Sequence, residues 1–205
     1  MARVAEVERI TKETSIWMKL NLDGRGEIKL DYPVGFMAHM LTAFAGHGLF
    51  DIELRASGDL EVDQHHLIED TGLVLGQCFS RALAEKRGIR RVGSCYFPMD
   101  ECLARAAVDI SGRPFLVFNG DLSGIPLVSQ SSSGSASFQV DTVQDFWQGF
   151  TSSSGITLHL DILRGRSDHQ KIEALFKAAA RSLREACEID PTIADLIPST
   201  KGVLA

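Results

Sequence analysis

An eight-residue motif occurs twice in this chain, and this repeat constrains the fold more than any other feature of the sequence. Asp63-Gln-His-His-Leu-Ile-Glu-Asp aligns with Ser167-Asp-His-Gln-Lys-Ile-Glu-Ala, so that His65 corresponds to His169 at a shift of 104 residues. Two segments upstream repeat in the same order: residues 36–41 match the segment at Asp145-Phe-Trp, and residues 51–55 match residues 157–161. We interpret the chain as an internal duplication, with chance similarity of two amphipathic helices as the alternative.

The duplication predicts an α+β fold with two half-domains related by a pseudo-twofold axis, each a mostly antiparallel sheet packed against helices. We expect residues 1–90 to form the first half, 91–189 the second, and 190–205 a C-terminal tail that closes over the site, all in one compact unit. Period-two alternation and the Asp23-Gly24 turn signal predict antiparallel strands within the first thirty residues. Apolar spacing predicts helices at 36–47, 67–83, 143–150 and 170–187. Further strands are expected at 51–56, 90–97, 101–110, 114–119 and 156–163, and the Ser/Gly-rich residues 129–137 predict a loop.

Composition limits the classes of partner. The 205 residues are 44% hydrophobic with a mean hydropathy of +0.02, which is enough for a buried core. A net charge of −6 argues against nucleic acid or an anionic membrane surface as the main partner. Neither a membrane-spanning run nor a signal peptide is evident. The cysteines lack C-x-x-C spacing, so we expect reduced thiols in the cytoplasm at Cys78, Cys95, Cys102 and Cys187.

Histidines near the predicted helix starts carry the strongest chemical signal. His65 and Glu69 are four residues apart, so they lie about 40° apart on one helix face, where both can ligate one cation. His169 and Glu173 repeat this spacing. His66 is rotated by about 100° from His65, so we expect it to serve another site.

The symmetry of the repeat groups these residues into two sites. The sets are His39, His66, His169 and Glu173 for one site, and His65, Glu69, Asp145 and Gln170 for the other. Residues on opposite faces of one helix do not meet readily, so such sites suit an interface between subunits. Imidazole and carboxylate ligands without thiolate suit Mn²⁺, Zn²⁺ or Fe²⁺, and the ligand set does not choose among them. The alternative for any single histidine is a helix cap or a core residue with one hydrogen bond.

Several segments extend this pattern along nearly the whole chain. They are Lys12-Glu-Thr-Ser-Ile, His39-Met-Leu, Gly58-Asp, His65-His-Leu-Ile-Glu-Asp, Met99-Asp-Glu, Asp109-Ile-Ser-Gly-Arg-Pro, His169-Gln-Lys-Ile-Glu-Ala-Leu-Phe-Lys and Pro198-Ser-Thr-Lys-Gly-Val-Leu. Together they resemble imidazoleglycerol-phosphate dehydratase, a family of histidine-biosynthesis enzymes. The resemblance implies a duplicated α+β fold, two Mn²⁺ ions per active site held between subunits, and a cage-like homo-oligomer, a 24-mer.

Residue by residue, the resemblance implies roles for single side chains. Glu13 matches the acid/base glutamate of the family, and we expect His66 and Glu173 to take part in catalysis beside it. The residues that match one complete metal site are His39, His66, His169 and Glu173, whereas those that match half of the other are His65 and Glu69. The side chains at phosphate-holding positions are Arg91, Arg113, Lys177, Ser199 and Lys201. Guanidinium, ammonium and hydroxyl groups all donate to phosphate oxygens.

Four positions depart from the pattern of the family. Gln170 stands where the second motif has its second His, and Asp145 stands where many members have a His and some an acidic residue. Ala43 replaces a polar residue near the phosphate site, and Ala38 replaces an acidic or amide residue beside His39. Because a neutral amide oxygen is a weaker ligand than imidazole for a divalent transition metal, we expect the site with Gln170 to bind metal more loosely.

The resulting hypothesis is a metal-dependent hydro-lyase that converts imidazole glycerol phosphate, a small phosphorylated imidazole, to imidazole acetol phosphate. The metals bind the substrate ring as imidazolate, the hydroxyl leaves through a diazafulvene-like intermediate, and Glu13 or a metal-bound water transfers the protons. One alternative is a catalytically weakened or inactive paralogue with one intact metal site, acting as an assembling or ligand-binding protein. Another is a metal-dependent hydrolase of a different phosphorylated small molecule, which leaves Glu13 unexplained.

Overall fold

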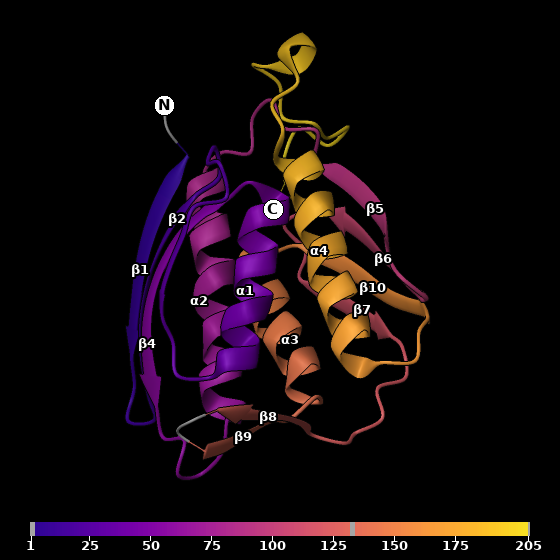
Figure 1. Ribbon diagram of the computed structural model, residues 1–205. Helices are drawn as coiled ribbons and strands as arrows, with labels where there is room; N and C mark the ends of the chain where they lie inside the picture. Colours follow the sequence, from indigo (N-terminus) through magenta and orange to yellow (C-terminus); the bar gives the residue numbers. More distant parts are fainter. Residues whose placement is uncertain (1–2, 132–133, 205) are drawn as a thin grey trace.

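Four helices lie between two four-stranded sheets in the computed structural model, which describes residues 3–131 and 134–204 (Figure 1). The elements of the first half are β1 (Val4–Ile10), β2 (Thr14–Asn21), β3 (Ile28–Asp31), α1 (Gly35–Gly48), β4 (Asp51–Gly58) and α2 (His65–Leu83). Those of the second half are β5 (Val92–Met99), β6 (Cys102–Asp109), β7 (Phe115–Asn119), β8 (Leu127–Ser131), β9 (Gly134–Phe138), α3 (Thr142–Ser154), β10 (Thr157–Arg164) and α4 (Asp168–Cys187).

The strand order confirms the predicted α+β duplication. The first sheet has the order β1-β2-β4-β3 and the second the order β5-β6-β10-β7. Each sheet has two antiparallel pairings and one parallel pairing, which joins β3 to β4 and β7 to β10. The expectation that all strands of the first thirty residues are antiparallel is therefore wrong for β3. The helix α1 crosses over between β3 and β4, and a crossover of this kind returns the chain parallel.

Period-two alternation places one face of each sheet against the helices. Along β2, Ile16, Met18 and Leu20 are fully buried, while the residues between them are more exposed. Between the sheets, fully buried aromatic rings fill the centre, among them Trp147 on α3 and Phe176 on α4, whose centroids lie 4.8 Å apart. Burying a side chain of this size contributes roughly 1.5–3 kcal/mol, so this aromatic centre fixes how the helices lie.

The helices pack in two pairs, α1 with α4 and α2 with α3. The second pair is in backbone contact, because a Cβ built on Gly149 would lie 2.6 Å from the carbonyl oxygen of Glu69. Gly72 on α2 makes a matching approach to the carbonyl of Phe146 on α3. Only residues without a side chain allow two helices to lie this close, and this contact brings Glu69 close to the first turns of α3.

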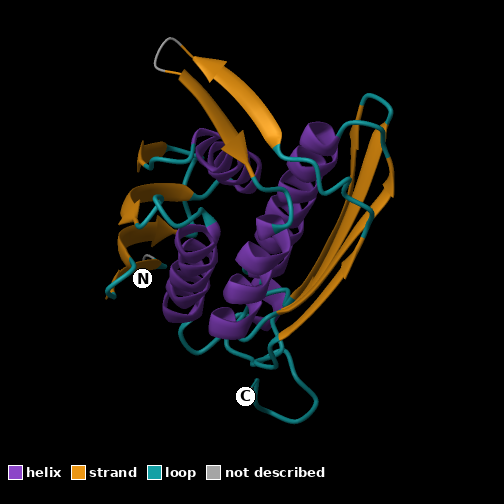
Figure 2. Ribbon diagram, turned by 90° about the horizontal axis from the view of Figure 1, so that it is seen from below, coloured by secondary structure: helices purple, strands orange, loops and turns teal. Residues whose placement is uncertain are grey.

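A β-hairpin stands where a loop was expected at residues 129–137. Strands β8 and β9 pair antiparallel, with Leu127 opposite Phe138, and the hairpin extends from the body of the molecule (Figure 2). Residues 132–133 lie outside the described part of the chain. The Ser/Gly-rich composition of this segment is typical of a loop and gave no signal for strands. Phe138 at the end of β9 is buried, and its ring lies 4.5 Å from that of Phe36, centroid to centroid. This aromatic contact ties the base of the hairpin to the start of α1.

The C-terminal segment after α4 packs at the far end of that helix and includes a 3₁₀ helix at Pro191–Ile193. The backbone N–H of Gly88 donates to the carbonyl of Leu196 at 2.9 Å, and Arg91 Nη1 donates to the carbonyl of Pro198 at 2.9 Å. Among the described residues, no helix is both long and apolar enough to cross a membrane. All four cysteines are free thiols; three are buried and Cys95 is partly exposed.

Candidate metal centre and active site

The helix pair α1 and α4 carries a cluster of two imidazoles and one carboxylate. His39 Nε2 lies 3.6 Å and His169 Nε2 lies 3.4 Å from Glu173 Oε2. One ligand atom from each of the three residues lies within 4.8 Å of the other two. The imidazoles are exposed and Glu173 is buried, so the donors converge at the surface. Nitrogen and carboxylate donors of this kind suit Mn²⁺, Zn²⁺ or Fe²⁺.

The surroundings of this cluster keep Glu173 ionised. Burial acts to raise the pKa of Glu173, but the hydrogen bond and charge of Lys177, followed by the charges of His39 and His169, hold the pKa below its ordinary value. Lys177 Nζ lies 2.7 Å from Glu173 Oε1, which leaves Oε2 to face the imidazoles. Phe36 meets the ring of His169 edge-on at 5.1 Å and limits its rotation. The carboxylate is thus ready to act as an anionic ligand.

The helix pair α2 and α3 carries the equivalent cluster from the other half. His65 Nε2 lies 3.5 Å from Glu69 Oε2, and His65 Nδ1 lies 3.2 Å from Asp145 Oδ2. The Asp63 carboxylate accepts the backbone N–H of His65 at 2.8 Å and so starts α2 at this residue. Asp145 corresponds to His39 in the duplication. Each lies ten residues before the residue with left-handed backbone conformation at the end of its helix, Gly155 after α3 and Leu49 after α1. This cluster therefore has one imidazole and two carboxylates. Glu69 faces Nε2 of the His65 ring, and Asp145 faces Nδ1.

The second residue of each helix motif points away from both clusters. His66 Nδ1 lies 3.1 Å from Asp59 Oδ2, and Gln170 Nε2 donates to Asp100 Oδ2 at 2.9 Å. Within the described chain, the expected sets of four are therefore incomplete: His66 does not reach the cluster of His169, and Gln170 does not reach that of His65. The reason is the rotation of about 100° per residue, which turns these side chains toward a neighbouring face. That they join such sites from a second copy of the chain stays a prediction.

Glu13 lies in the turn between β1 and β2, at a polar pocket of about 320 Å³ whose lining includes Lys12, Asp59 and Glu61. The side chain is exposed. The pKa of His66 is raised, chiefly by its hydrogen bond to Asp59, and the charge of Glu13 adds to this effect. The structure therefore places Glu13 at a pocket that is also lined by Asp59, the partner of His66, another of the expected catalytic residues. The third, Glu173, lies in the α1–α4 cluster.

Four of the five phosphate candidates lie elsewhere in the chain. Arg91 donates through Nε and Nη2 to Asp109, at 2.7 and 3.0 Å, and Arg113 lies 3.8 Å from the same carboxylate. The Pro198 carbonyl that accepts from Arg91 places this group beside the tail. There Lys201 is exposed and Ser199 is half-buried, and the Lys201 backbone N–H donates to Ser199 Oγ at 3.2 Å.

Most of the length of α4 separates these four phosphate candidates from the candidate metal ligands of the α1–α4 cluster. The backbone N–H of Arg91 donates to Ala186 at the end of α4, and at 1.5 Å per residue Ala186 is about 25 Å along that helix from His169. Lys177 is the fifth phosphate candidate and lies between them, beside Glu173. Within one chain the tail therefore does not cover the cluster of His169. Closure over a site of a neighbouring subunit stays a prediction.

Three carboxylates that hold site residues were not identified as such from the sequence. Asp59 holds His66, Asp100 holds Gln170, and Asp109 holds Arg91. Each lies within one of the segments quoted above, but the pairing joins different strands, helices and loops. Spacing along the chain gave no signal for these contacts, because only the folded topology brings the partners together.

Comparisons with known proteins agree with one another. The family model for imidazoleglycerol-phosphate dehydratase matches residues 33–183. A curated relative of that name from Cereibacter sphaeroides is 50% identical over 202 residues, covering 98% of this chain and 100% of the relative.

Solved structures with the same description have the same fold. The imidazoleglycerol-phosphate dehydratase from Staphylococcus aureus superposes with a TM-score of 0.77 at 34% identity, covering 91% of this chain and 99% of that one. The enzyme from Pyrococcus furiosus, in complex with (S)-C348, gives a TM-score of 0.74 at 33% identity, covering 97% of this chain and all of that one. The family suggested by the two His/Glu motifs is thus confirmed, and the chain belongs to the imidazoleglycerol-phosphate dehydratase family.

Proposed function

We propose that this protein is a metal-dependent hydro-lyase that dehydrates imidazole glycerol phosphate to imidazole acetol phosphate in histidine biosynthesis. The observation that carries the proposal is the cluster of His39, His169 and Glu173, in which two exposed imidazoles and a buried carboxylate converge. Family membership supplies the substrate, and the cluster supplies the donors that a metal needs. The expected sites of Mn²⁺ are this cluster and the one on α2 and α3.

The donor chemistry of both clusters fits a divalent transition metal, but to different degrees. His39, His169 and Glu173 offer two nitrogens and one oxygen, whereas His65 has only the carboxylates of Glu69 and Asp145 beside it. Bound metal supplies positive charge that stabilises an electron-rich substrate ring. Because imidazole is the stronger ligand for these ions, we infer that the α2–α3 site binds Mn²⁺ more loosely.

Glu13 is the group that we assign to proton transfer. Its carboxylate is exposed at the polar pocket and lies within electrostatic range of His66. A general acid or base needs reach to the reacting proton before its pKa matters, and the open pocket gives that reach. The proton on the weakly acidic carbon of the substrate is the one that we expect Glu13 to move.

The separation of about 25 Å along α4 supports a homo-oligomer. A small substrate cannot contact both the cluster of His169 and the group of Arg91 and Arg113 in one chain. We therefore propose that Arg91, Arg113, Ser199 and Lys201 bind the phosphate end of a substrate whose ring is held by another subunit. The family resemblance favours a 24-mer for this assembly.

A catalytically weakened or inactive paralogue is the second candidate function. It is favoured by Gln170, an amide that stands opposite His66 in the duplication and is hydrogen-bonded to Asp100. Such a protein keeps metal at the α1–α4 cluster and assembles without turning over the substrate.

An assay for imidazole acetol phosphate separates the two candidates. Purified protein is first treated with chelator and then titrated with Mn²⁺ in the presence of imidazole glycerol phosphate. We expect no product with chelator and recovery of activity with metal. No product at saturating Mn²⁺, from protein shown to be folded and assembled, contradicts the dehydratase and favours the paralogue.

A further inference from the structure

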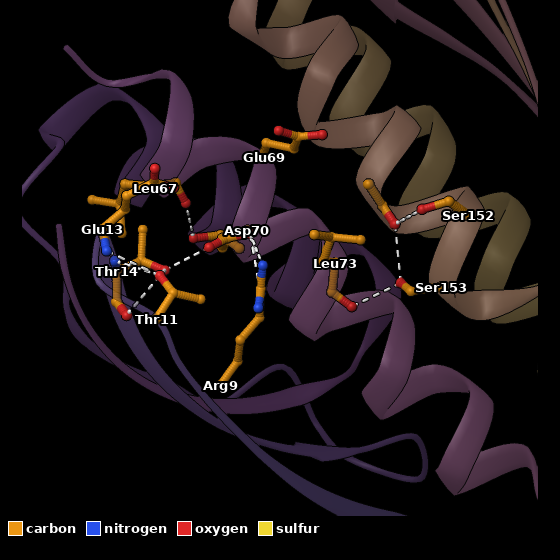
Figure 3. A network of polar contacts seen from close by, with 12 residues as sticks. Arg9, Thr11, Glu13, Thr14, Leu67, Glu69, Asp70, Leu73, Ser152 and Ser153 are labelled. Atoms are coloured by element: carbon orange, nitrogen blue, oxygen red, sulfur yellow. Dashed lines mark hydrogen bonds and ion pairs between the residues drawn. The ribbon is translucent and has the colours of Figure 1, made fainter. Parts of the chain in front are cut away.

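A buried polar network joins the β1–β2 turn to α2 (Figure 3). Thr14 is 3% exposed, and its hydroxyl lies 2.5 Å from Asp70 Oδ2. Asp70 is 7% exposed, and Arg9 Nη2 lies 2.9 Å from Asp70 Oδ1. Because a carboxylate paired with arginine only accepts hydrogen bonds, Thr14 donates its hydroxyl proton to Asp70. The Thr14 oxygen then accepts from the hydroxyl of Thr11, which lies 3.3 Å away.

Thr11 extends this network to the backbone of Glu13. The oxygen of Thr11 accepts the backbone N–H of Glu13 at 3.1 Å and that of Thr14 at 2.9 Å. The Thr11 N–H donates to the Thr14 carbonyl at 2.8 Å. The turn is therefore shaped by hydroxyl groups whose orientation depends on Asp70.

A second link holds Glu13 from the other side. The carbonyl of Glu13 accepts the backbone N–H of Asp59 at 3.0 Å, and the carboxylate of Asp59 holds His66 Nδ1. His66 and Asp70 are four residues apart, so they lie one turn apart on the same side of α2. The two links thus close a ring that begins at His66, passes through Glu13 and returns to α2 at Asp70.

The duplication shows that the sheet order does not need this network. Strand register aligns β1 and β2 with β5 and β6, so that Glu13 corresponds to Glu101. The second half has the same sheet order, but its turn differs, because Asp100, the counterpart of Lys12, has a φ of 52° whereas Lys12 and Glu13 are not among the residues with positive φ. The residues that stand there in place of Arg9, Thr14 and Asp70 are Phe97, Cys102 and Ala174. A buried carboxylate paired with arginine gives little net stability compared with apolar residues at the same positions. Stability therefore does not explain why the first half has this network.

We propose that Asp70 is a positioning residue, which fixes the β1–β2 turn so that the Glu13 carboxylate stays at the pocket that Asp59, the partner of His66, also lines. This inference deepens the proposed function and rests on the assignment of Glu13 to proton transfer. Asp70 is buried and acts through Thr14 and Thr11 rather than on the substrate. A displaced acid or base loses catalytic power steeply with distance, whereas substrate binding by other groups is unaffected.

The first test compares Asp70→Asn with a matched control. Asp161 on β10 is also 7% exposed and pairs with an arginine, Arg105, at 3.0 Å, but it belongs to the second sheet. At saturating Mn²⁺ we expect Asp70→Asn to lower kcat by about 10- to 100-fold with little change in KM. Asp161→Asn keeps the wild-type kcat. Equal losses in both variants, or weaker Mn²⁺ binding by Asp70→Asn in a direct titration, overturn the proposal.

A double-mutant cycle tests whether Asp70 acts through Glu13. Once Glu13→Gln has removed the carboxylate, adding Asp70→Asn causes no further loss, because the two residues form one unit. Thr14→Ser keeps the hydroxyl and retains activity, whereas Thr14→Val, of nearly the same shape, loses it like Asp70→Asn. Losses that multiply in the cycle contradict the positioning role. A fully active Glu13→Gln instead removes the assignment of Glu13, and the positioning role with it.

Amide hydrogen exchange gives a readout that does not depend on turnover. In Asp70→Asn and Thr14→Val, the N–H groups of residues 11–14 exchange faster than in the wild type, while those of residues 99–102 in the equivalent turn are unchanged. If the wild type lacks dehydratase activity, the proposed function fails, and this exchange pattern still decides whether Asp70 orders the turn. Unchanged exchange at residues 11–14 overturns the positioning.

Discussion

A methyl group added at Gly149 on α3 tests whether close packing of α2 against α3 stabilises the fold and the cluster of His65. A Cβ there would lie 2.6 Å from the Glu69 carbonyl oxygen and 3.0 Å from the Leu73 backbone nitrogen, so α2 and α3 must move apart. Over-packing of this kind costs about 1–3 kcal/mol, and the helix preference of alanine offsets about 1 kcal/mol of it. We expect Gly149→Ala to lower stability by up to about 2 kcal/mol, which corresponds to a fall in Tm of about 4–8 °C for a chain of this size.

The matched control is Gly46→Ala on α1, where nothing lies within 4 Å of the added Cβ. This variant gains only the helix preference, about 1 kcal/mol, and its Tm rises. Thermal unfolding of both variants is compared at one protein concentration, because oligomers unfold at temperatures that depend on concentration. In Gly149→Ala we also expect weaker metal binding at the cluster of His65. If Gly149→Ala proves as stable as Gly46→Ala, the backbone contact between α2 and α3 is refuted.

Three further outcomes follow from the two clusters. Gln170→His raises the affinity for Mn²⁺ in a calorimetric titration, since imidazole replaces an amide; an unchanged affinity refutes the account of a loose site. His39→Ala lowers the number of Mn²⁺ ions bound per chain, whereas His47→Ala at the other end of α1 leaves it unchanged. Lys177→Met destabilises the protein by about 1.5–3 kcal/mol at neutral pH. The pKa of Glu173 lies below its ordinary value of 4.5 in the folded protein, so the stabilisation by the Lys177–Glu173 ion pair is complete above pH 4.5. The difference in the free energy of unfolding between Lys177→Met and the wild type therefore shrinks as acidification protonates Glu173. Urea unfolding from neutral pH to about pH 4 measures this difference, and a constant difference contradicts the pairing.

Periodicity and the repeat were sufficient to predict most of the fold. The expected helices lie within about two residues of their predicted bounds, except that α3 continues four residues beyond its predicted end, to Ser154, and the sheets follow the predicted duplication. The pairing of β3 was missed because strand direction depends on the crossover through α1, which alternation does not encode. The β8–β9 hairpin was missed because its strands are short and rich in serine, and their signal rests on the pairing of Leu127 with Phe138.

For the candidate site, sequence predicted the pairs on a single helix but not the contacts between elements. His65 with Glu69 and His169 with Glu173 follow from helix geometry alone. The joining of His39 to the second pair followed from the symmetry of the repeat. The symmetry of the repeat did not predict the position of the His66 side chain, because its partner Asp59 directly follows β4.

The duplication also explains why one of two equivalent glutamates is the better candidate for proton transfer. Glu101 stands where Glu13 stands in the other half, but the backbone N–H groups of Glu101 itself and of Arg166 hold the pKa of Glu101 below its ordinary value. A carboxylate whose anion is stabilised in this way is a weaker base. At Glu13 the backbone is held by Thr11 and Asp59, and the exposed side chain lies at the polar pocket that Asp59 also lines. The two equivalent turns thus differ in backbone conformation and in the groups that hold their glutamates, and this difference supports the proposed assignment of proton transfer to Glu13 rather than to Glu101.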